Sequence, residues 1–366
     1  MSTKKILVLV PGPNARGGIT NYYYSIRKEL PENVIYVVRG SRSWPKKENK
    51  FREIRRFLSD NYNFVKLLIK EDVSLIQVTL PFTSTAIIRD GLFILIGKLF
   101  RKKVTIFFRG WIDDFVYNLS GIKLLFVKRI LFLADSIIEL SEDNIKHLRH
   151  LGYTKKIYLE TTLVDRSLIE DLNFDDQFEK RRLSQKKTIL FLSRLEKEKG
   201  IFLLLDVYEK IKEKFPQYEL VYAGDGREES NLNKRIHDSG IQGVSLKGFV
   251  NGESKKQLFK EATIFVFLSE HEGMPNAVLE AMAFGLPVIT TNVGGIASVF
   301  KDGVNGCLLN DTNKDFIAKQ ITDLVSDENK YKKISFTNLK EAHEKFTSNV
   351  VAKRLMTIFK ETISSN

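Results

Sequence analysis

Residues 269–289, SEHEGMPNAVLEAMAFGLPVI, place a polar turn, an apolar helix and the start of a strand in direct succession. The five residues before them, IFVFL at 264–268, are all apolar, which indicates a short buried strand. Asn276 opens an apolar run that fits a buried helix ending at Gly285, and Pro287 stops that helix before a second strand at 288–290. A strand, a turn, a helix and a strand in this order predict a unit of a parallel α/β sheet.

The turn before this helix is a predicted anion site. Its residues are Gly273, Met274 and Pro275, and Asn276 begins the helix. The first amides of a helix have no acceptor within the helix, and the positive end of the helix dipole lies at the same place. Both features favour a bound anion.

Two glutamates flank this site, Glu272 in the turn and Glu280 inside the apolar helix. A carboxylate among apolar neighbours is costly unless a partner binds it. The partner is either a sugar hydroxyl or, in the alternative, a cap or salt bridge within the fold. We favour a sugar ligand because the spacing of the glutamates, the turn and the Gly-Leu-Pro segment after the helix occur together.

Residues 272–296, EGMPNAVLEAMAFGLPVITTNVGGI, resemble the retaining nucleotide-sugar glycosyltransferases of family 4, which have the GT-B fold. The stretch contains the paired glutamates, the glycine-bearing turn and the trailing Gly-Gly of that family. The resemblance is strong from Thr188 to Gly306 and weaker before it. It implies an α/β protein with two Rossmann-like, doubly wound parallel-sheet domains that face each other across a cleft.

The chain length agrees with two domains. A chain of 366 residues exceeds what one hydrophobic core usually supports. We expect an acceptor-side domain at 1–165, a nucleotide-sugar donor domain at 166–347, and a last helix at 348–366 that crosses back to the first domain. The polar stretch 171–187 is expected to separate the two halves.

Cysteine usage and hydropathy predict a cytoplasmic location. Cys307 is the single cysteine, which excludes an internal disulfide and suits a reducing compartment. The apolar run at 6–10 stops at Pro11 without a cleavage site and is expected to be a first strand. The longest other apolar run, at 92–96, is too short to span a bilayer. The inner face of the cell membrane is an alternative place for the protein.

The first half begins like a Rossmann domain, with a strand at 6–10, a glycine loop and a helix from Tyr22. Gly18 and Ile19 stand where a P-loop needs lysine and a hydroxyl residue, so an ATPase is excluded. The family resemblance places Gly17 and Gly18 near the donor phosphate, although such a loop can also be only a tight turn.

Arg109 follows a predicted strand at 104–108, where the family commonly has a histidine. Ligands bind at the carboxyl ends of strands in open α/β sheets. An arginine there places a permanent cation near the leaving phosphate but does not exchange protons at neutral pH. This departure puts the family role of the histidine in doubt for this chain.

The second half has the family's donor signature after the predicted strand at 188–192. Arg194 provides a planar fork of donors and Lys199 a movable charge, which together suit a diphosphate. Solvated surface charges are the alternative interpretation. Gly224 ends the strand at 219–223 and allows the backbone to approach a ligand.

The nucleotide base has its own predicted site. By the family resemblance, the main chain at Gly248, Phe249 and Val250 surrounds the base, after the strand that begins at residue 244. Phe249 is otherwise a core residue.

The family resemblance implies a retaining, hexosyl-type glycosyltransferase with a nucleotide diphosphate sugar as donor and a glycan or a lipid-linked acceptor, in bacterial surface polysaccharide synthesis. The chain has no Asp-x-Asp pair and no His/Cys cluster at metal spacing, so we expect neither a metal nor another cofactor. Arg194, Lys199, Arg109 and the helix start would stabilise the leaving diphosphate. Glu272 would hold the donor sugar and Glu280 the ribose.

Three other functions use some of the same features. A GT-B sugar-nucleotide epimerase would share the fold, but its chemistry needs proton-transfer residues that the motif lacks. A non-catalytic partner subunit would agree with the missing histidine. A basic nucleic-acid-binding protein would explain the charge but neither the glutamates nor the diphosphate signature, so we expect no nucleic acid partner.

The net charge is +13, from 58 Lys and Arg against 45 Asp and Glu, which implies an anionic partner. A handful of basic residues suffices for reversible attachment to an anionic membrane surface; a solvated face is the alternative. The basic residues of the first half are Arg39, Arg42, Lys46, Lys47, Lys50, Arg52, Arg55, Arg56, Lys98, Arg101, Lys102 and Lys103, beside Trp44, Phe51, Leu92, Phe93 and Phe100.

Overall fold

The structure is a computed structural model that describes residues 4–15, 17–40, 49–111, 115–116 and 118–365. Arg42, Trp44, Lys46 and Lys47 lie outside the described residues. The chain divides into two compact units. The first consists of Met1–Thr162 with Ser348–Asn366, and the second is Leu163–Thr347.

The first unit contains a six-stranded sheet with the order β2-β1-β3-β4-β5-β6. Every neighbouring pair in this sheet is parallel. The strands are β1 (Lys5–Val10), β2 (Val34–Val38), β3 (Val73–Phe82), β4 (Lys103–Trp111), β5 (Ser136–Glu139) and β6 (Lys156–Leu159). Parallel strands place all their carboxyl ends at one edge of the sheet, which is where ligands bind in such folds.

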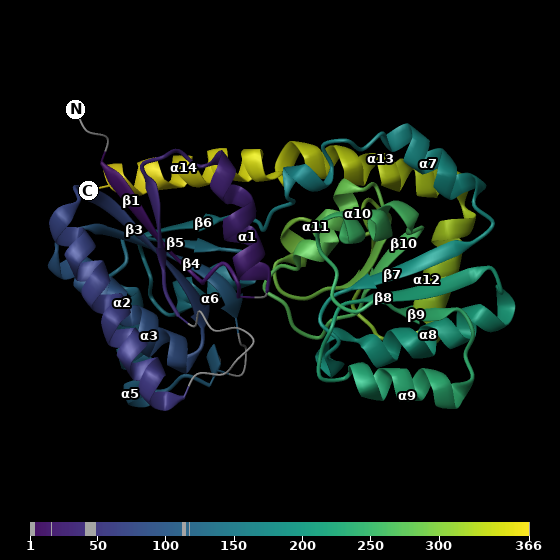
Figure 1. Ribbon diagram of the computed structural model, residues 1–366, viewed down its shortest axis with the longest axis horizontal. Helices are drawn as coiled ribbons and strands as arrows, with labels where there is room; N and C mark the ends of the chain where they lie inside the picture. Colours follow the sequence, from purple (N-terminus) through teal and green to yellow (C-terminus); the bar gives the residue numbers. More distant parts are fainter. Residues whose placement is uncertain (1–3, 16, 41–48, 112–114, 117, 366) are drawn as a thin grey trace. The chain divides into compact units, whose positions relative to one another are not determined.

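Helices cover both faces of this sheet (Figure 1). One face is packed by α2 (Lys50–Lys70), α3 (Ser84–Leu99), α5 (Gly121–Leu131) and α6 (Glu142–His150). The other face is packed by α1 (Gly18–Ile26), the short η1 (Arg27–Glu29) and the last helix, α14 (Ser348–Ser364). The chain therefore returns to the first unit after the second unit is complete.

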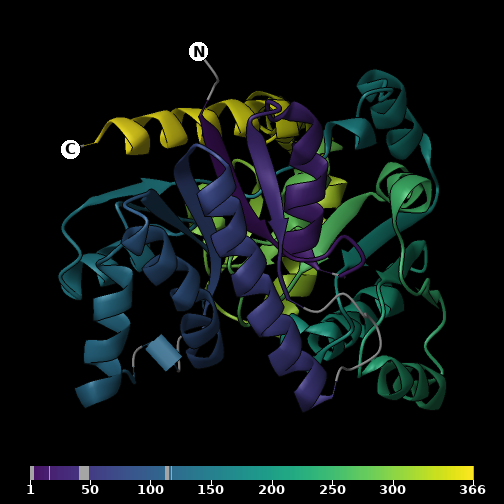
Figure 2. The ribbon, with the colours of Figure 1, turned by 60° about the vertical axis from the view of Figure 1, so that its left-hand side comes forward.

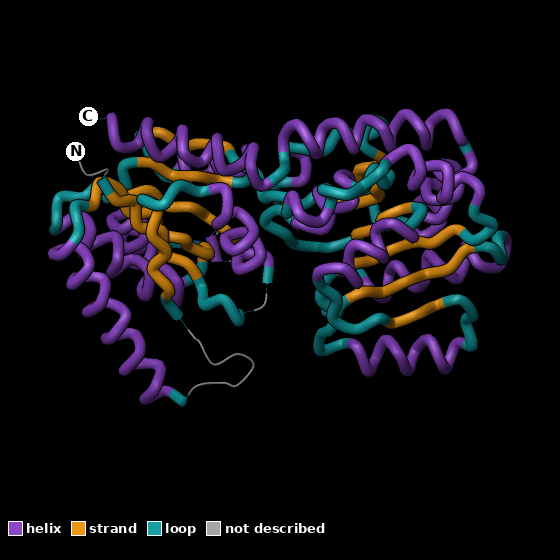
Figure 3. The backbone as a smooth tube through the Cα atoms, turned by 45° about the horizontal axis from the view of Figure 1, so that its top comes forward, coloured by secondary structure: helices purple, strands orange, loops and turns teal. Residues whose placement is uncertain are grey.

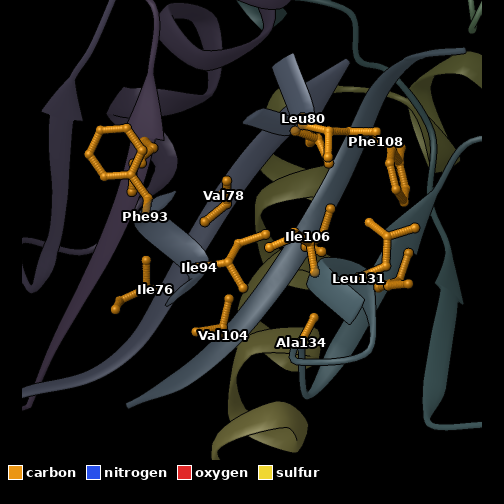
Figure 4. Close-up of a cluster of buried hydrophobic side chains, with 14 of the residues drawn as sticks. Ile76, Val78, Leu80, Phe93, Ile94, Val104, Ile106, Phe108, Leu131 and Ala134 are labelled. Atoms are coloured by element: carbon orange, nitrogen blue, oxygen red, sulfur yellow. The ribbon is translucent and has the colours of Figure 1, made fainter. Parts of the chain in front are cut away.

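Alternate residues of the central strands make the core under α2, α3 and α5. Figure 4 shows apolar side chains of β3 and β4, such as Val78 and Ile106, against Ile94 of α3 and Leu131 of α5. The intervening residues point to the other face, where the Ser136 hydroxyl lies 2.8 Å from the Thr362 hydroxyl of α14. This second face is mixed, because apolar residues such as Leu75 and Phe107 lie there beside the buried polar residues Gln77 and Thr105.

The second unit repeats this plan with a sheet of order β12-β11-β10-β7-β8-β9, again parallel throughout. Its strands are β7 (Lys187–Leu192), β8 (Tyr218–Ala223), β9 (Val244–Leu246), β10 (Ile264–Phe267), β11 (Val288–Thr291) and β12 (Gly306–Leu309). In Figure 3 the strands of each unit form a layer between helices.

The helices of the second unit include α8 (Ile201–Lys214), which contacts α12 (Lys314–Ser326), and α11 (Asn276–Ala283), which contacts α13 (Glu328–Lys345). The remaining elements are η2 (Arg166–Leu168), α7 (Phe174–Leu183), η3 (Lys197–Lys199), α9 (Glu229–Ser239), α10 (Gly252–Glu261) and η4 (Ile296–Ser298). All residues of α11 after Asn276 are buried, as the apolar pattern predicts.

The expectation that residues 171–187 separate the two halves is wrong. This stretch contains α7, which lies within the second unit and begins with the Asn173 side chain accepting from the Asp176 amide. Arg181 is buried and donates to the carbonyls of Phe284 at 2.9 Å and Phe259 at 3.0 Å. A stretch that looks polar in the sequence is therefore held in the core by Arg181 together with the buried Phe174 and Phe178.

Two of the basic residues of the first half are paired with carboxylates of the fold and contribute neither to a membrane-binding surface nor to the solvated face considered as its alternative. Arg39 is buried, lies 3.2 Å from the Asp90 carboxylate and donates to the Thr79 carbonyl at 2.6 Å. Lys98 pairs with Asp135 at 2.8 Å. Phe93 is buried in the core, whereas Phe51 is 76% exposed. Only part of the predicted basic and aromatic cluster is therefore available to a partner.

One buried carboxyl group makes the first unit sensitive to pH. Glu139 ends β5, and its Oε2 accepts from the Leu140 amide at 2.5 Å and from the Asn144 side chain at 3.3 Å. Oε1 is buried without a hydrogen-bond partner in the described residues. Burial raises the pKa of Glu139 from 4.5 to about 8.

We predict that Glu139 lowers the stability of the protein as the pH rises from 4.5 to about 8. In this window the folded state keeps a proton that the unfolded chain has lost, so stability falls with pH, by at most about 1.4 kcal/mol per pH unit. Glu139→Gln should therefore gain stability relative to the wild type as the pH rises, which melting curves at several pH values would measure. Parallel pH dependences of the two proteins would contradict this assignment.

Candidate functional site

The predicted donor residues of the second unit lie at the carboxyl edge of its sheet. Arg194 and Lys199 follow β7, Gly224 follows β8, Gly248 follows β9, and Glu272 follows β10. Because the strands are parallel, the loops after them meet at the same edge. The sequence separates these residues by up to 78 positions, and the sheet brings their loops together.

Backbone hydrogen bonds join these loops directly. The loop after β7 is bonded to the loop after β8 by the Leu195 amide and the Asp225 carbonyl at 2.9 Å, and to the loop after β10 by the Glu270 amide and the Glu198 carbonyl at 2.9 Å. The Gly224 amide donates to the Gly248 carbonyl at 2.7 Å. The loops therefore form one connected support for the side chains they carry.

Two glycines allow this close contact. Gly224 has a φ of +144°, and a Cβ at this position would overlap the Ser193 carbonyl. Gly294 has a φ of +58°, and a Cβ at this position would overlap the Glu272 carbonyl. Any larger residue at either position would push the neighbouring loop away from the sheet edge.

Lys199 and Glu272 form an ion pair at the centre of this edge. The Lys199 Nζ lies 2.6 Å from Glu272 Oε1 and also donates to the His271 carbonyl at 3.2 Å. The Lys199 side chain is 9% exposed and that of Glu272 is 18% exposed. Two residues predicted to bind different parts of a donor therefore hold each other in place, because each offsets the desolvation of the other.

Glu280 also has a lysine partner, Lys255, a residue that the sequence interpretation did not name. Glu280 is buried in α11, and the Lys255 Nζ of α10 lies 2.7 Å from its Oε1. The salt bridge within the fold that we considered as the alternative is therefore present. Its other oxygen, Oε2, accepts no hydrogen bond within the described residues. Lys255 follows a polar helix start in the sequence, and no pattern there marks it as a site residue.

Arg194 and the start of α11 supply positive potential at the same edge. Arg194 is exposed and has no ion-pair partner in the part of the chain that the structure describes. The first turn of α11 contains no acidic residue. The amides after Pro275 therefore keep the electropositive character of a helix start. Met274 and Pro275 are buried, Gly273 is half-buried, and together they fix the direction of this turn.

The residues predicted to surround the base follow β9. Phe249 is 49% exposed, so the alternative that it is a core residue is wrong. Gly248 adopts a φ of +62°, and Val250 is half-buried. An exposed aromatic ring at a strand end offers a flat apolar surface, which is compatible with stacking of a base.

The predicted site residues of the first unit are Arg109, Gly17 and Gly18. The Arg109 guanidinium carbon lies 4.0 Å from the centre of the Tyr22 ring, and Nη2 donates to the Thr162 hydroxyl at 3.3 Å. Burial lowers the pKa of Arg109. Its Nε and Nη1 are buried without an acceptor in the described residues. Gly17 caps α1 at a φ of +136°, and Gly18 is the first residue of that helix.

A cavity of about 570 Å³ lies near the donor residues, on the β10, β11 and β12 side of the same sheet edge. Its lining includes Lys197, Phe202, Glu270, Asn292 and Asp311. None of Arg194, Lys199, Glu272 and Glu280 lines it. The cavity is therefore adjacent to the predicted donor residues but is not formed by them.

Metal ligands are a separate question. Within the described ranges, no group of three or more His, Cys, Asp or Glu side chains could hold a metal ion. The expectation of a metal-free reaction stays a prediction.

Most of the second unit, residues 173–340, matches the sequence model of the family described as Glycosyl transferases group 1. An uncharacterized glycosyltransferase of Methanocaldococcus jannaschii, MJ1607, is 35% identical over 48% of this chain and 45% of that protein. The capsular polysaccharide biosynthesis glycosyltransferase CapM of Staphylococcus aureus is 25% identical over 67% of this chain and 69% of that protein. The chain spans about half the length of the first curated relatives that it matches.

The fold resembles the solved structure of Anabaena Alr3699/HepE in complex with UDP and glucose. It superimposes with a TM-score of 0.74 and 17% identity, covering 98% of this chain and 100% of that one. Together with the two six-stranded parallel sheets, this likeness confirms the predicted α/β fold of the GT-B type. The match to the group 1 family model lies entirely within the second unit.

We predict that Lys255→Met destabilises the protein, because it leaves the Glu280 carboxylate buried without its cation. Breaking one side of a buried pair costs about 3–5 kcal/mol. Denaturant unfolding should detect this loss, and adding Glu280→Gln should restore much of it. Lys247→Met, at an exposed position, serves as the matched control. Equal stability of Lys255→Met and the control would show that the pair contributes nothing.

Proposed function

We propose that this protein is a retaining glycosyltransferase that transfers a hexosyl group from a nucleotide diphosphate sugar to a glycan or lipid-linked acceptor. The observation that carries the proposal is the Lys199–Glu272 pair beside the start of α11, with Arg194 on the same sheet edge. This edge belongs to the segment that matches the group 1 family. Cations and a carboxylate on one sheet edge support a site that binds the phosphates and the sugar of such a donor.

The leaving group is a nucleotide diphosphate, and its charge has to be stabilised as the bond to the sugar breaks. Arg194 is exposed and can turn to a phosphate, and the first amides of α11 add donors in a fixed direction. Lys199 adds charge when its ammonium group is shared between Glu272 and the diphosphate. We infer that these protein groups replace a divalent ion, so that transfer needs no metal and no other cofactor.

The two glutamates have different roles in this proposal. Glu272 accepts hydrogen bonds from hydroxyls of the transferred sugar, and Lys199 orients it from the other side. Glu280 offers Oε2 to the ribose hydroxyls while Lys255 keeps Oε1. Gly248, Phe249 and Val250 line the base, and Gly224 and Gly273 allow the backbone to approach the phosphates.

The reaction forms a bond between the acceptor oxygen and the anomeric carbon as the bond from that carbon to the diphosphate oxygen breaks. Both events take place on the same face of the sugar, so the anomeric configuration is retained. A departing phosphate oxygen takes the proton of the acceptor hydroxyl, so no protein base is required. In the first unit, Arg109 with Gly17 and Gly18 is proposed to assist the leaving phosphate.

Similar proteins suggest which substrates to test first. The Anabaena structure holds UDP and glucose, which makes UDP-sugars the first donors to try. The role of CapM in capsular polysaccharide biosynthesis supports a growing bacterial surface glycan as acceptor. We propose that the protein acts on it from the cytoplasm, at the inner face of the cell membrane, and without nucleic acid.

The test is incubation of the protein with a panel of nucleotide sugars, each with and without chelator. We expect slow hydrolysis or transfer from one donor, an α-configured first product by NMR, and no loss of rate with chelator. An inverted product would exclude the retaining mechanism, and a strict divalent requirement would exclude the metal-free one. Nucleotide binding without turnover of any donor would favour a non-catalytic subunit, while conversion to an epimeric nucleotide sugar would favour an epimerase.

Replacing the two glutamates separately should affect different quantities, kcat for Glu272 and UDP affinity for Glu280. Glu272→Gln should lower kcat about 100-fold or more while leaving UDP affinity unchanged or higher, because it frees Lys199 for phosphate. Glu280→Gln should weaken UDP binding about tenfold, the size expected for a charge-assisted contact. Calorimetry and initial rates measure the two effects.

Glu270→Gln is the matched control for both variants. Glu270 is exposed beside Glu272 and lines the neighbouring cavity instead. It should change neither quantity. A Glu280→Gln enzyme with unchanged UDP affinity would remove Glu280 from the donor site.

A further inference from the structure

The outer surface of the helical layer on the first sheet is unusually apolar. Helices α2, α3 and α5 lie next to one another, with α3 contacting both of the others. Eleven of the seventeen exposed large hydrophobic side chains among the described residues belong to these three helices. They are Phe51, Ile54, Leu58, Tyr62 and Ile69 of α2, Ile88, Leu95 and Leu99 of α3, and Ile122, Leu125 and Phe126 of α5. We call these residues and the basic side chains beside them the three-helix face.

The apolar residues of this face follow helical spacing. On α2 they stand at positions 51, 54, 58, 62 and 69, which at 100° per residue fall within a sector of about 80°. On α3 the exposed positions 88, 95 and 99 repeat after seven and four residues. Each helix buries its opposite side, such as Phe64 of α2 and Ile94 of α3, in the core. Each helix is therefore apolar on two sides, and one of them has no partner in the unit.

Figures 1 and 2 show that α2 lies on the face of the first sheet opposite to α14. At 1.5 Å per residue, its 21 residues extend over about 30 Å. The neighbouring helices α3 and α5 broaden this surface to three helices. Contiguous apolar surfaces of this size on a soluble unit mark a binding face.

The charges beside the apolar residues identify the kind of partner. On α2, Arg52, Arg55, Lys66 and Lys70 are exposed on one side of the apolar sector. Further exposed basic residues are Arg101 after α3, and Lys123 and Arg129 on α5.

Acidic residues are nearly absent from the same surface. In α2, α3 and α5 the carboxylates are Glu53, Asp60 and Asp90, and of these only Glu53 is exposed. Asp90 is buried against Arg39 and Arg89. The three-helix face therefore presents apolar and positive groups with almost no negative ones.

We propose that the three-helix face binds the surface of an anionic lipid bilayer. Its apolar side chains enter the boundary between headgroups and acyl chains, and its lysines and arginines contact the anionic headgroups. Among the described helices, none has the length and apolar character needed to cross a membrane. The inference extends the proposed function, since a lipid-linked acceptor lies in such a surface, but its test uses no nucleotide.

Charge also separates this partner from the other possible occupants. A second copy of the chain would bring the same basic residues against each other, and like charges across an interface oppose association. Nucleic acid would satisfy the charge, but phosphate contacts need no surface of eleven apolar side chains. An anionic bilayer satisfies both the apolar and the basic groups.

The experiment is co-sedimentation with vesicles of phosphatidylcholine alone and with phosphatidylglycerol as a second component. At physiological ionic strength, about 0.15 M, the wild type should bind the anionic vesicles at least tenfold more strongly than the neutral ones. Binding should fall at about 1 M salt, where charges are screened within about 3 Å.

Two pairs of variants test the surface. Leu99→Asp with Ile122→Asp should lower vesicle binding at least tenfold. Arg55→Gln with Lys66→Gln should lower it about 25-fold, because each basic residue near an anionic surface contributes about fivefold. Phe316→Asp is the matched control, since Phe316 is 45% exposed on α12 of the second unit. Melting curves show that each variant is folded.

Three outcomes would overturn the proposal. These are equal binding of the wild type to neutral and anionic vesicles, an equal loss of binding in Phe316→Asp, and concentration-dependent self-association that Leu99→Asp with Ile122→Asp abolishes. The last outcome would identify the face as an interface between copies of the chain. None of these results depends on whether the protein turns over a nucleotide sugar, so the two proposals are tested separately.

Discussion

Parallel pairing at the centre of the second sheet determines which residues can meet at its edge. Strand β7 lies between β10 and β8. The loops that follow these three strands are therefore neighbours, although they are far apart in the sequence. For this reason the Lys199 Nζ, in the loop after β7, lies 2.6 Å from Glu272 Oε1, in the loop after β10. If β7 and β10 were not neighbours, the same residues would be separated by at least one strand.

Two ion pairs also balance the charges of the site. Lys199 offsets Glu272, and Lys255 offsets Glu280, so each of these two carboxylates already has a cation. A diphosphate that contacts Lys199 has to share it with Glu272, which costs less than leaving a buried charge without a partner. Arg194, with no ion-pair partner among the described residues, adds net positive charge to this edge.

The sequence predicts the sheet framework well because parallel strands that are covered on both faces have continuous apolar runs. The runs before Pro11 and Ser269 both form strands, β1 and β10. The helix that begins at Asn276 is equally clear from its apolar pattern. Proximity of Arg194, Lys199 and Glu272 at one edge follows from the strand order of this fold class. The roles of these residues toward a substrate stay predictions.

The rest depends on contacts that no local pattern contains. Helix α2 starts with the Asn49 cap, which accepts from the Arg52 amide, but its exposed apolar stripe and its basic residues obscure the core-facing side. Arg181 and Lys255 look like ordinary surface residues in the sequence. Only the folded chain shows that one binds three carbonyls of the core and the other binds Glu280.

The return of the chain to its first unit has a consequence for synthesis on the ribosome. Helix α14 covers β3 and β4, and its Arg354 holds Glu160, yet it is translated only after the entire second unit. At 5–20 residues per second, the first sheet waits roughly ten to forty seconds for this cover. During that interval the side of β3 and β4 that α14 covers, which includes Leu75 and Phe107 beside the polar Gln77 and Thr105, is exposed to solvent or to chaperones. The nascent first unit therefore presents an uncovered sheet face until translation is complete.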